Sequence, residues 1–240
     1  MWQISDGDLA LSKDKVHVWR ANLNLSADEI DSFAAILSKD ERLRADRFRF
    51  PQHRRRFIAA RGILRKILAS YLNLPSKSLQ FAYGDRGKPK LLDCTLQFNI
   101  SHSQELALYG VTCERKIGID LEYLKTTTDF KKIARRFFAP RETEYIECLS
   151  EKKQKQAFFQ LWTAKEAYLK ATGEGLTGSL DKIEIFITPE LSAKLLAIEG
   201  NTFAATKWSI ISFIPATNYV ATLAIDTPIP KPEIKFLNWN

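Results

Sequence analysis

Hydrophobic and polar positions divide this chain into segments with the two-residue period of strands and segments with the spacing of helices. In the first part of the chain the pattern predicts strands at residues 16–20, 79–83, 96–100, 106–111 and 117–122, and helices at 26–37, 40–48 and 53–72. In the second part it predicts helices at 130–138, 141–148 and 153–172, and strands at 183–187, 208–213 and 219–225. The pattern therefore predicts an α+β protein.

Three local expectations complete this pattern. Residues 101–103, Ser-His-Ser, have the composition of a polar loop. The strand at 106–111 is expected to pair with the next one along the chain, at 117–122. The tail from Pro228 is punctuated by prolines and is expected to lie loosely on the molecule.

The order of elements in residues 38–112, helices and then strands, recurs in residues 129–225. An aromatic-proline element, at 48–51 and again at 137–140, stands in both stretches. This order indicates a duplicated α+β unit, although the helix sequences themselves differ. A length of 240 residues fits one compact body or two small halves.

Charge and cysteine content restrict the function classes. Lys and Arg number 36 against 28 acids, and this basic excess attracts anions such as nucleic acid, a phosphorylated cofactor or an acidic protein, although most single arginines are expected to face solvent. The three cysteines form neither a disulfide pattern nor a zinc motif, which fits the reduced cytosol. Residues 1–11 include Asp6 and Asp8, unlike a signal peptide, and no run approaches eighteen apolar residues. We expect a soluble cytoplasmic protein that does not contact a membrane.

Candidate chemistry lies in two segments. In residues 117–122 aliphatic side chains alternate with Gly118, Asp120 and Glu122, so a strand would present both acids on one face. In residues 162–170 Glu166 and Lys170 are four apart and share one face of the predicted helix. Because Mg²⁺ prefers oxygen ligands and is commonly shared between carboxylates and phosphates, the two segments together indicate phosphoryl-type chemistry.

The same segments, with two others before them, follow one another in an order that closely resembles the Sfp-type 4′-phosphopantetheinyl transferases. The resemblance extends from about residue 40 to about residue 177. It rests on these motifs: Gly87-Lys88-Pro89-Lys90-Leu91, Phe98-Asn99-Ile100-Ser101-His102-Ser103, Ile117-Gly118-Ile119-Asp120-Leu121-Glu122 and Trp162-Thr163-Ala164-Lys165-Glu166-Ala167-Tyr168-Leu169-Lys170.

The resemblance implies a pseudo-twofold pair of α+β halves, residues 1–112 with the nucleotide contacts of coenzyme A and residues 113–240 with the metal site and catalytic helix. It implies transfer of the phosphopantetheine arm of coenzyme A to a serine of a carrier protein, with release of adenosine 3′,5′-bisphosphate. By this resemblance Asp120, Glu122 and Glu166 hold Mg²⁺, and Lys170 contacts the diphosphate or the leaving group. Glu166 is also the expected base, acting directly or through a water on the cation.

Further contacts to coenzyme A are carried over in the same way. Ser101 and His102 are expected at the 3′-phosphate. Lys88, between Gly87 and Pro89, is expected to line the adenine pocket. Basic contacts to the phosphates are expected from arginines of the first half, namely Arg44 and Arg61, with Arg47 and Arg56 as rivals.

The expected partners are acidic acyl, peptidyl or aryl carrier proteins of fatty-acid, polyketide or peptide synthesis, docking near the aromatic segment 130–138. A monomer is expected, because two halves in one chain already form the cleft, and no nucleic acid is expected. Two alternatives remain open at this point: a magnesium-dependent nuclease, and a noncatalytic module that binds nucleic acid or acidic protein.

Overall fold

The computed structural model describes residues 2–4, 9–124, 129–175, 180–188, 192–226 and 232–239, and the structural statements below concern these residues. The helices are α1 (Ala27–Ile36), α2 (Lys39–Asp46), α3 (Pro51–Leu72), α4 (Phe130–Phe137), α5 (Pro140–Cys148), α6 (Glu151–Thr172) and α7 (Thr202–Ala205). The strands are β1 (Gln3–Ile4), β2 (Lys15–Asn22), β3 (Phe81–Tyr83), β4 (Pro89–Leu91), β5 (Leu96–Ser103), β6 (Leu106–Cys113), β7 (Ile117–Tyr123), β8 (Ile183–Ile187), β9 (Ala193–Ile198), β10 (Trp208–Phe213), β11 (Tyr219–Asp226) and β12 (Glu233–Asn238).

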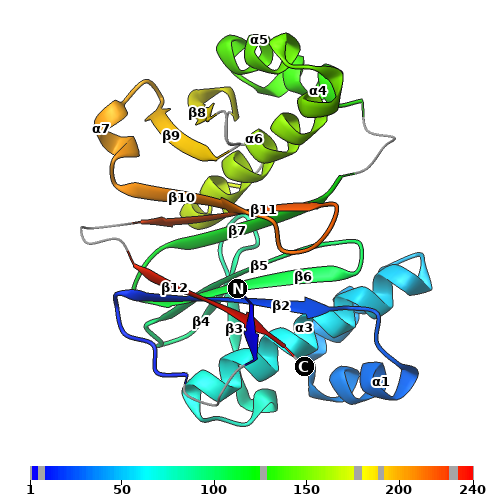
Figure 1. Cartoon of the computed structure of the whole chain (residues 1–240). Helices are drawn as coiled ribbons and strands as arrows, with labels where there is room; N and C mark the ends of the chain where they lie inside the picture. Colours follow the sequence, from blue (N-terminus) through cyan, green and yellow to red (C-terminus); the bar gives the residue numbers. More distant parts are fainter. Residues whose placement is uncertain are drawn as a thin grey trace.

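The molecule is a stack of helix, sheet, sheet and helix (Figure 1). One sheet has the strand order β1-β12-β2-β6-β5, and α3 packs on its outer face; the other has the order β10-β11-β7, with α6 on its outer face. A third core fills the space between the sheets, built from aliphatic side chains of β2, β6, β7 and β11. The α+β class predicted from the sequence is confirmed.

The two sheets repeat one topology. In each sheet one strand, β6 or β11, pairs antiparallel with the strand just before it along the chain and with the strand that opens its half, β2 or β7. In both halves a helix of 22 residues and then a two-stranded hairpin stand between the opening strand and the last two strands. This repeated order agrees with the duplication that the sequence indicated.

Two of the strand expectations were wrong. The segment 101–103 is the end of β5 and no loop, because its backbone pairs with β6 up to Ser103 opposite Leu106, and the turn comes only at Gln104, whose φ is +53°. Strand β6 pairs with β5 and β2, whereas β7 pairs with β11. If β6 and β7 formed a hairpin, β7 would belong to the five-stranded sheet and would not lie beside β11 under α6.

The expectation of a loose tail was also wrong. Strand β12 lies parallel to β2 and to β1, between them, and Leu237 is fully buried. The tail residues that precede β12, 227–231, lie outside the described residues. Because β12 joins the sheet built by residues 15–113, the last strand of the chain returns to the first half. Among the described residues, no helix is both long and apolar enough to cross a membrane.

Candidate active site

The two acids of β7 lie where the alternation placed them. Ile119 and Leu121 are buried in the core between the sheets, and Asp120, on the opposite face of the strand, is 4% exposed. Gly118 brings this face against α6, since a Cβ at that position would stand 2.0 Å from the carbonyl oxygen of Ala167. The close approach places the second predicted segment, on α6, directly over the acids.

Lys170 and Ser101 hold one oxygen of Asp120. The Nζ of Lys170 lies 2.5 Å from Asp120 Oδ1, and the hydroxyl of Ser101 donates to the same oxygen at 2.9 Å. Lys170 also donates to Ser101 Oγ at 3.0 Å. Residues from β5, β7 and α6, and so from both halves of the chain, therefore meet at a single carboxylate.

Glu166 completes the group. Burial, and after it the carboxylates of Asp120 and Glu122, raise its pKa to about 7 against the opposing effect of Lys170. These contributions show that the three acids act on one another across the site. Glu122 accepts a hydrogen bond at 3.1 Å from Ser103, whereas Asp120 Oδ2 and Glu166 Oε1 are buried oxygens without a hydrogen-bond partner.

The two unpartnered oxygens test whether these residues fit a cation. Within the ranges that the structure describes, no three His, Cys, Asp or Glu side chains form a group that could hold a metal ion, so a ready-made three-carboxylate cage is not present. A buried carboxylate oxygen without a partner is costly, and Mg²⁺ is commonly held by one or two carboxylates together with substrate phosphates. Asp120 and Glu166 fit that smaller donor set.

A row of polar side chains on β5 joins the two sheets beside this group. The side chain of Asn99 accepts a hydrogen bond from the backbone N–H of Ile119 on β7 at 2.9 Å. In the same way Ser101 accepts from Leu121 N–H at 3.2 Å, and Ser103 accepts from Tyr123 N–H at 3.1 Å. Sequence analysis missed this role of Asn99 and Ser103. The available signal was the spacing of two residues along Asn99, Ser101 and Ser103, because a polar face that repeats every second residue is typical of a strand.

His102 lies on the other face of β5 from Ser101, because consecutive strand residues alternate. Its side chain is exposed, and partial desolvation by the surrounding protein lowers its pKa, as do the positive charges of Lys170 and Arg56. The surroundings of His102 are thus electropositive and suit an anion.

A cavity of about 610 Å³ in the first half contains several of the predicted cofactor residues. Arg44, Arg47 and Gly87 line it together with Tyr83. Arg61 lies behind this cavity: its guanidinium is nearly buried, contacts Glu41 at 2.6 Å and donates to the hydroxyl of Tyr83 at 3.1 Å. The structure therefore brings Arg44 and its rival Arg47 to one surface and leaves Arg61 to support it.

Lys88 links the two halves. Its Nζ donates to the carbonyl oxygens of Ile117 and Ala171 at 2.9 and 3.0 Å, and Pro89, the next residue, opens β4. Burial, and after it the charge of Lys116, lower the pKa of Lys88 to about 8 against the opposing effect of Asp226. The ammonium therefore points to the second half, so a contact of Lys88 with an adenine would involve its methylene chain or the adjacent backbone.

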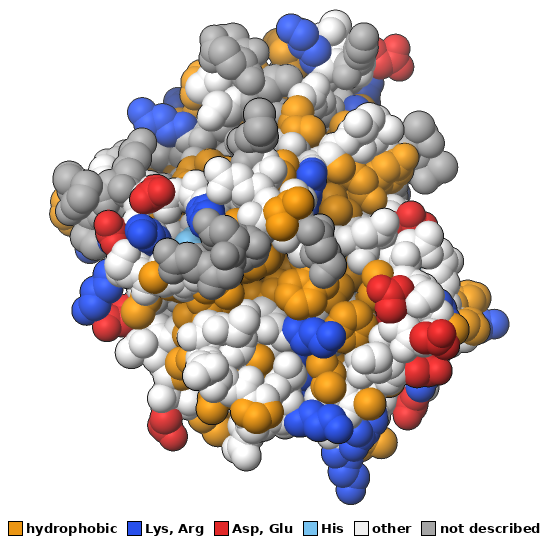
Figure 2. Space-filling model, turned by 60° about the horizontal axis from the view of Figure 1, so that its bottom comes forward, with side chains coloured by type: hydrophobic (Ala, Val, Ile, Leu, Met, Phe, Trp, Pro, Cys, Tyr) orange, Lys and Arg blue, Asp and Glu red, His pale blue; other side chains and the backbone are white. Residues whose placement is uncertain are grey.

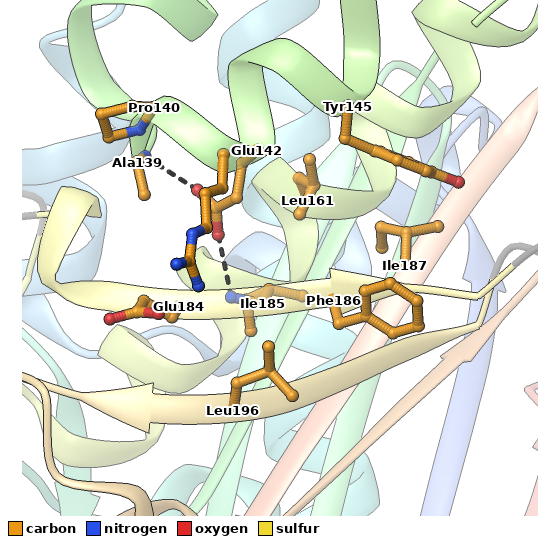
Figure 3. A pocket seen from close by; sticks show the side chains of 11 residues that line it. Ala139, Pro140, Glu142, Tyr145, Leu161, Glu184, Ile185, Phe186, Ile187 and Leu196 are labelled. Carbon is orange, nitrogen blue, oxygen red and sulfur yellow. Dashed lines mark hydrogen bonds between the residues drawn. The ribbon is translucent and has the colours of Figure 1, made fainter. Parts of the chain in front are cut away.

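A second cavity, of about 750 Å³, lies apart from these residues, between α5 and the β8–β9 hairpin (Figure 3). Its lining is mainly apolar, with Ile185, Phe186 and Leu196 along the hairpin. Glu142 beneath it accepts the N–H groups of Ala139 and Ile185 at 2.9 and 2.8 Å. None of the predicted site residues lines this cavity.

The basic excess is divided over the surface. Figure 2 shows Lys and Arg side chains in separate groups on the face drawn, interspersed with hydrophobic and acidic side chains. A protein that follows a nucleic-acid backbone generally presents a continuous basic stripe, and this face has none.

Comparisons with known proteins agree with the geometry. The sequence model of the 4′-phosphopantetheinyl transferase superfamily matches residues 116–224, and that of the 4′-phosphopantetheinyl transferase N-terminal region matches residues 21–113. The chain is 46% identical over 228 residues to the 4′-phosphopantetheinyl transferase HetI of Nostoc sp., with 93% of each chain covered. It is 31% identical over 164 residues to the 4′-phosphopantetheinyl transferase Sfp of Bacillus subtilis, which covers 67% of this chain and 71% of that one.

Carboxylates and a lysine that meet at the junction of two α+β halves are residues an enzyme can use, and the relatives named above are enzymes. The chain belongs to the 4′-phosphopantetheinyl transferase superfamily, as the sequence motifs indicated, and is a 4′-phosphopantetheinyl transferase. Nothing in the comparisons supports a nuclease.

Proposed function

We propose that this enzyme moves the 4′-phosphopantetheine arm of coenzyme A to a serine hydroxyl of an apo acyl, peptidyl or aryl carrier protein. The serine oxygen forms a bond to the β-phosphorus, the diphosphate bond breaks, and adenosine 3′,5′-bisphosphate leaves. The observation that carries this proposal is the meeting of Asp120, Glu166 and Lys170 where the two halves join, with two buried carboxylate oxygens left without partners.

Mg²⁺ is proposed as the cofactor, held by Asp120 and Glu166 with Glu122 beside them; when bound, it would offset the charge of the diphosphate. Lys170, whose ammonium already contacts Asp120 Oδ1, would neutralise charge on the leaving phosphate. These contacts favour the transition state because negative charge increases there.

Glu166 is proposed to accept the proton of the incoming serine. Without a cation, burial and the neighbouring acids raise the pKa of Glu166 to about 7. A bound cation would lower this pKa and keep the carboxylate ionised, so that Glu166 could take the proton directly or through a water on the cation. Asp120 is less suited to this role because Lys170 and Ser101 occupy its Oδ1.

Coenzyme A is proposed to place its 3′-phosphate at His102, with the positive charge of Arg56 nearby. The cavity lined by Arg44, Arg47 and Gly87 is proposed for the rest of the nucleotide. Arg61 would act there through Tyr83.

The carrier is proposed to dock at α4, which presents Lys131, Lys132, Arg135 and Arg136 at the surface beside partly buried aromatic side chains. Carriers of this kind are expected to be acidic, and complementary charge would speed the encounter. We propose a cytoplasmic monomer, since the cysteines, Cys94, Cys113 and Cys148, are free thiols and one chain supplies both halves of the site.

The experiment is to incubate apo carrier proteins of fatty-acid, polyketide and peptide synthesis with coenzyme A, Mg²⁺ and the enzyme, and to measure carrier mass. We expect the mass of at least one carrier to rise by one phosphopantetheine. Chelation with EDTA, and separately Asp120→Asn, should abolish the increase. Unchanged masses across all carriers would refute the proposal, and cleavage of DNA under the same conditions would support the nuclease instead.

A further inference from the structure

The hydroxyl of Ser101 is fully used inside the protein. It donates to Asp120 Oδ1 at 2.9 Å, accepts from Lys170 Nζ at 3.0 Å and accepts from the backbone N–H of Leu121 at 3.2 Å. A serine hydroxyl has one hydrogen to donate and two lone pairs. With 7% of the residue exposed, Ser101 has no remaining capacity for a phosphate oxygen.

These three contacts determine how Asp120 is presented. Ser101 and Lys170 both occupy Oδ1, so the carboxylate turns Oδ2 away from them, and Oδ2 is the oxygen that stays buried without a partner. The contact between Ser101 and Lys170 closes a triangle of hydrogen bonds. Because Leu121 N–H fixes Ser101 to the backbone of β7, the triangle has a rigid support.

His102, the residue after Ser101, has a side chain that is accessible to a ligand. His102 follows Ser101 on β5, so its side chain lies on the other face of the strand, where it is exposed. Lys170 and Arg56 add positive charge there. Two consecutive strand residues cannot both direct their side chains at one phosphate, and His102 is the one with free access.

We propose that Ser101 is a positioning residue, which orients Asp120 and Lys170 and leaves Asp120 Oδ2 free, and that it does not bind the 3′-phosphate that the family resemblance assigned to it. This inference rests on the proposed function, because coenzyme A is the substrate in question. It separates the two residues of one motif into a residue that organises the site and a residue that binds the nucleotide.

The experiment compares coenzyme A with 3′-dephospho-coenzyme A, which lacks only the phosphate at issue. For Ser101→Ala we expect kcat to fall about 10²-fold with both substrates, the loss typical of a displaced catalytic group, while KM changes little. For His102→Ala we expect KM to rise with coenzyme A and to stay unchanged with the dephospho form. If the penalty of Ser101→Ala disappeared with 3′-dephospho-coenzyme A, Ser101 would be a phosphate ligand and our inference would be wrong.

A binding measurement without turnover gives an independent result. Calorimetric titration with adenosine 3′,5′-bisphosphate in EDTA should give the wild-type Kd for Ser101→Ala and a weaker Kd for His102→Ala. Equal weakening in both variants would overturn the inference. Circular dichroism checks whether Ser101→Ala folds. If it does not, Ser101→Cys, which has a side chain of similar size and a weaker donor, replaces it in the kinetic and calorimetric experiments, and the same outcomes decide.

The outcomes also separate this inference from the function on which it rests. A wild-type enzyme that modifies no carrier would refute the proposed function, and the calorimetric comparison would still decide the role of Ser101. A wild-type enzyme that is active, together with a Ser101→Ala variant that behaves like His102→Ala, would refute only the inference.

Discussion

Gly118 offers a direct test of whether the distance between β7 and α6 sets the activity. In Gly118→Ala the new methyl group would stand 2.0 Å from Ala167 O and 2.4 Å from the backbone nitrogen of Ala171. Ordinary contact begins at 3.4 Å, so α6 must move away from β7 by about 1.4 Å. The obstructing atoms are backbone, and no change of side-chain rotamer can relieve the clash.

The expected consequences follow from this displacement. Overpacking of a tight core costs roughly 1–3 kcal/mol. Because 1 kcal/mol lowers Tm by about 2–4 °C in a chain of this size, Tm should fall by roughly 2–12 °C. Glu166 and Lys170 move with α6 while Asp120 stays on β7, and a misplacement of about 1 Å can cost about 10²-fold in rate. We therefore expect kcat for carrier modification to fall by about that factor.

Gly110→Ala is the matched control, since it adds the same methyl group to β6, a strand of the other sheet that faces the core between the sheets. At Gly110 the Cβ would stand 2.8 Å from Ile117 Cδ1, the end of a flexible side chain that can rotate. We expect a small loss of Tm and near wild-type kcat. Thermal unfolding and steady-state transfer to an apo carrier measure both quantities. A Gly118→Ala enzyme with wild-type kcat would show that the spacing of strand and helix does not govern the chemistry, whatever its Tm.

Three further predictions concern stability, pH and salt. Lys165→Met should lower the free energy of unfolding by about 3–5 kcal/mol in denaturant titration, because it leaves buried Glu142 without the cation 2.7 Å away; a loss within experimental error would contradict this. Lys88 has a pKa of about 8 in the folded protein and about 10.4 in the unfolded chain, so the folded state loses this proton first as the pH rises. The free energy of unfolding of the wild type should therefore increase between about pH 8 and 10.4 relative to that of Lys88→Met. Parallel curves of unfolding free energy against pH would refute this prediction. Carrier kcat/KM should fall as NaCl rises, and less steeply in a variant with Lys131 and Arg135 changed to Gln; equal slopes would place the carrier elsewhere.

The sequence predicted the parts of the site that depend on local periodicity. Alternation around Asp120 predicted a strand with its acids on one face, and the spacing of Glu166 and Lys170 predicted one helical face; both are as observed. Each of these features is set by the geometry of a single element. Their meeting at one carboxylate followed from the family resemblance and not from the pattern.

The parts that could not be predicted depend on contacts between distant segments. Insertion of β12 between β1 and β2 joins the two ends of the chain, and no local pattern encodes that pairing. The composition of residues 101–103 is typical of a loop, but those residues lie in a strand because Ser101 and Ser103 satisfy N–H groups on β7. A polar residue that serves a neighbouring strand is indistinguishable in sequence from one that serves solvent.

The two halves share a buried ion pair at equivalent places. The long helices α3 and α6 have equal lengths, and the fifteenth residue of each is a buried cation, Arg65 or Lys165. Each cation contacts the glutamate at the third position of the preceding helix, Glu41 at 2.6 Å or Glu142 at 2.7 Å. Each also donates to a backbone carbonyl between the long helix and the following hairpin. This pair is therefore part of the scaffold, which explains why it stands in both halves.

The active-site chemistry is not repeated, and packing explains the difference. In the first half Tyr71 fills the space between helix and strand, and its hydroxyl contacts His17 and Trp19 on β2. At the corresponding place α6 has Ala171, which meets Gly118 and lets the helix approach β7 closely. In the second half Lys170 of α6 reaches Asp120 on β7, whereas β2 contains no acidic residue for α3 to reach. The small residues Gly118 and Ala171, together with the acid on β7, therefore explain why the carboxylate and lysine group forms on α6 and β7 and has no counterpart on α3 and β2.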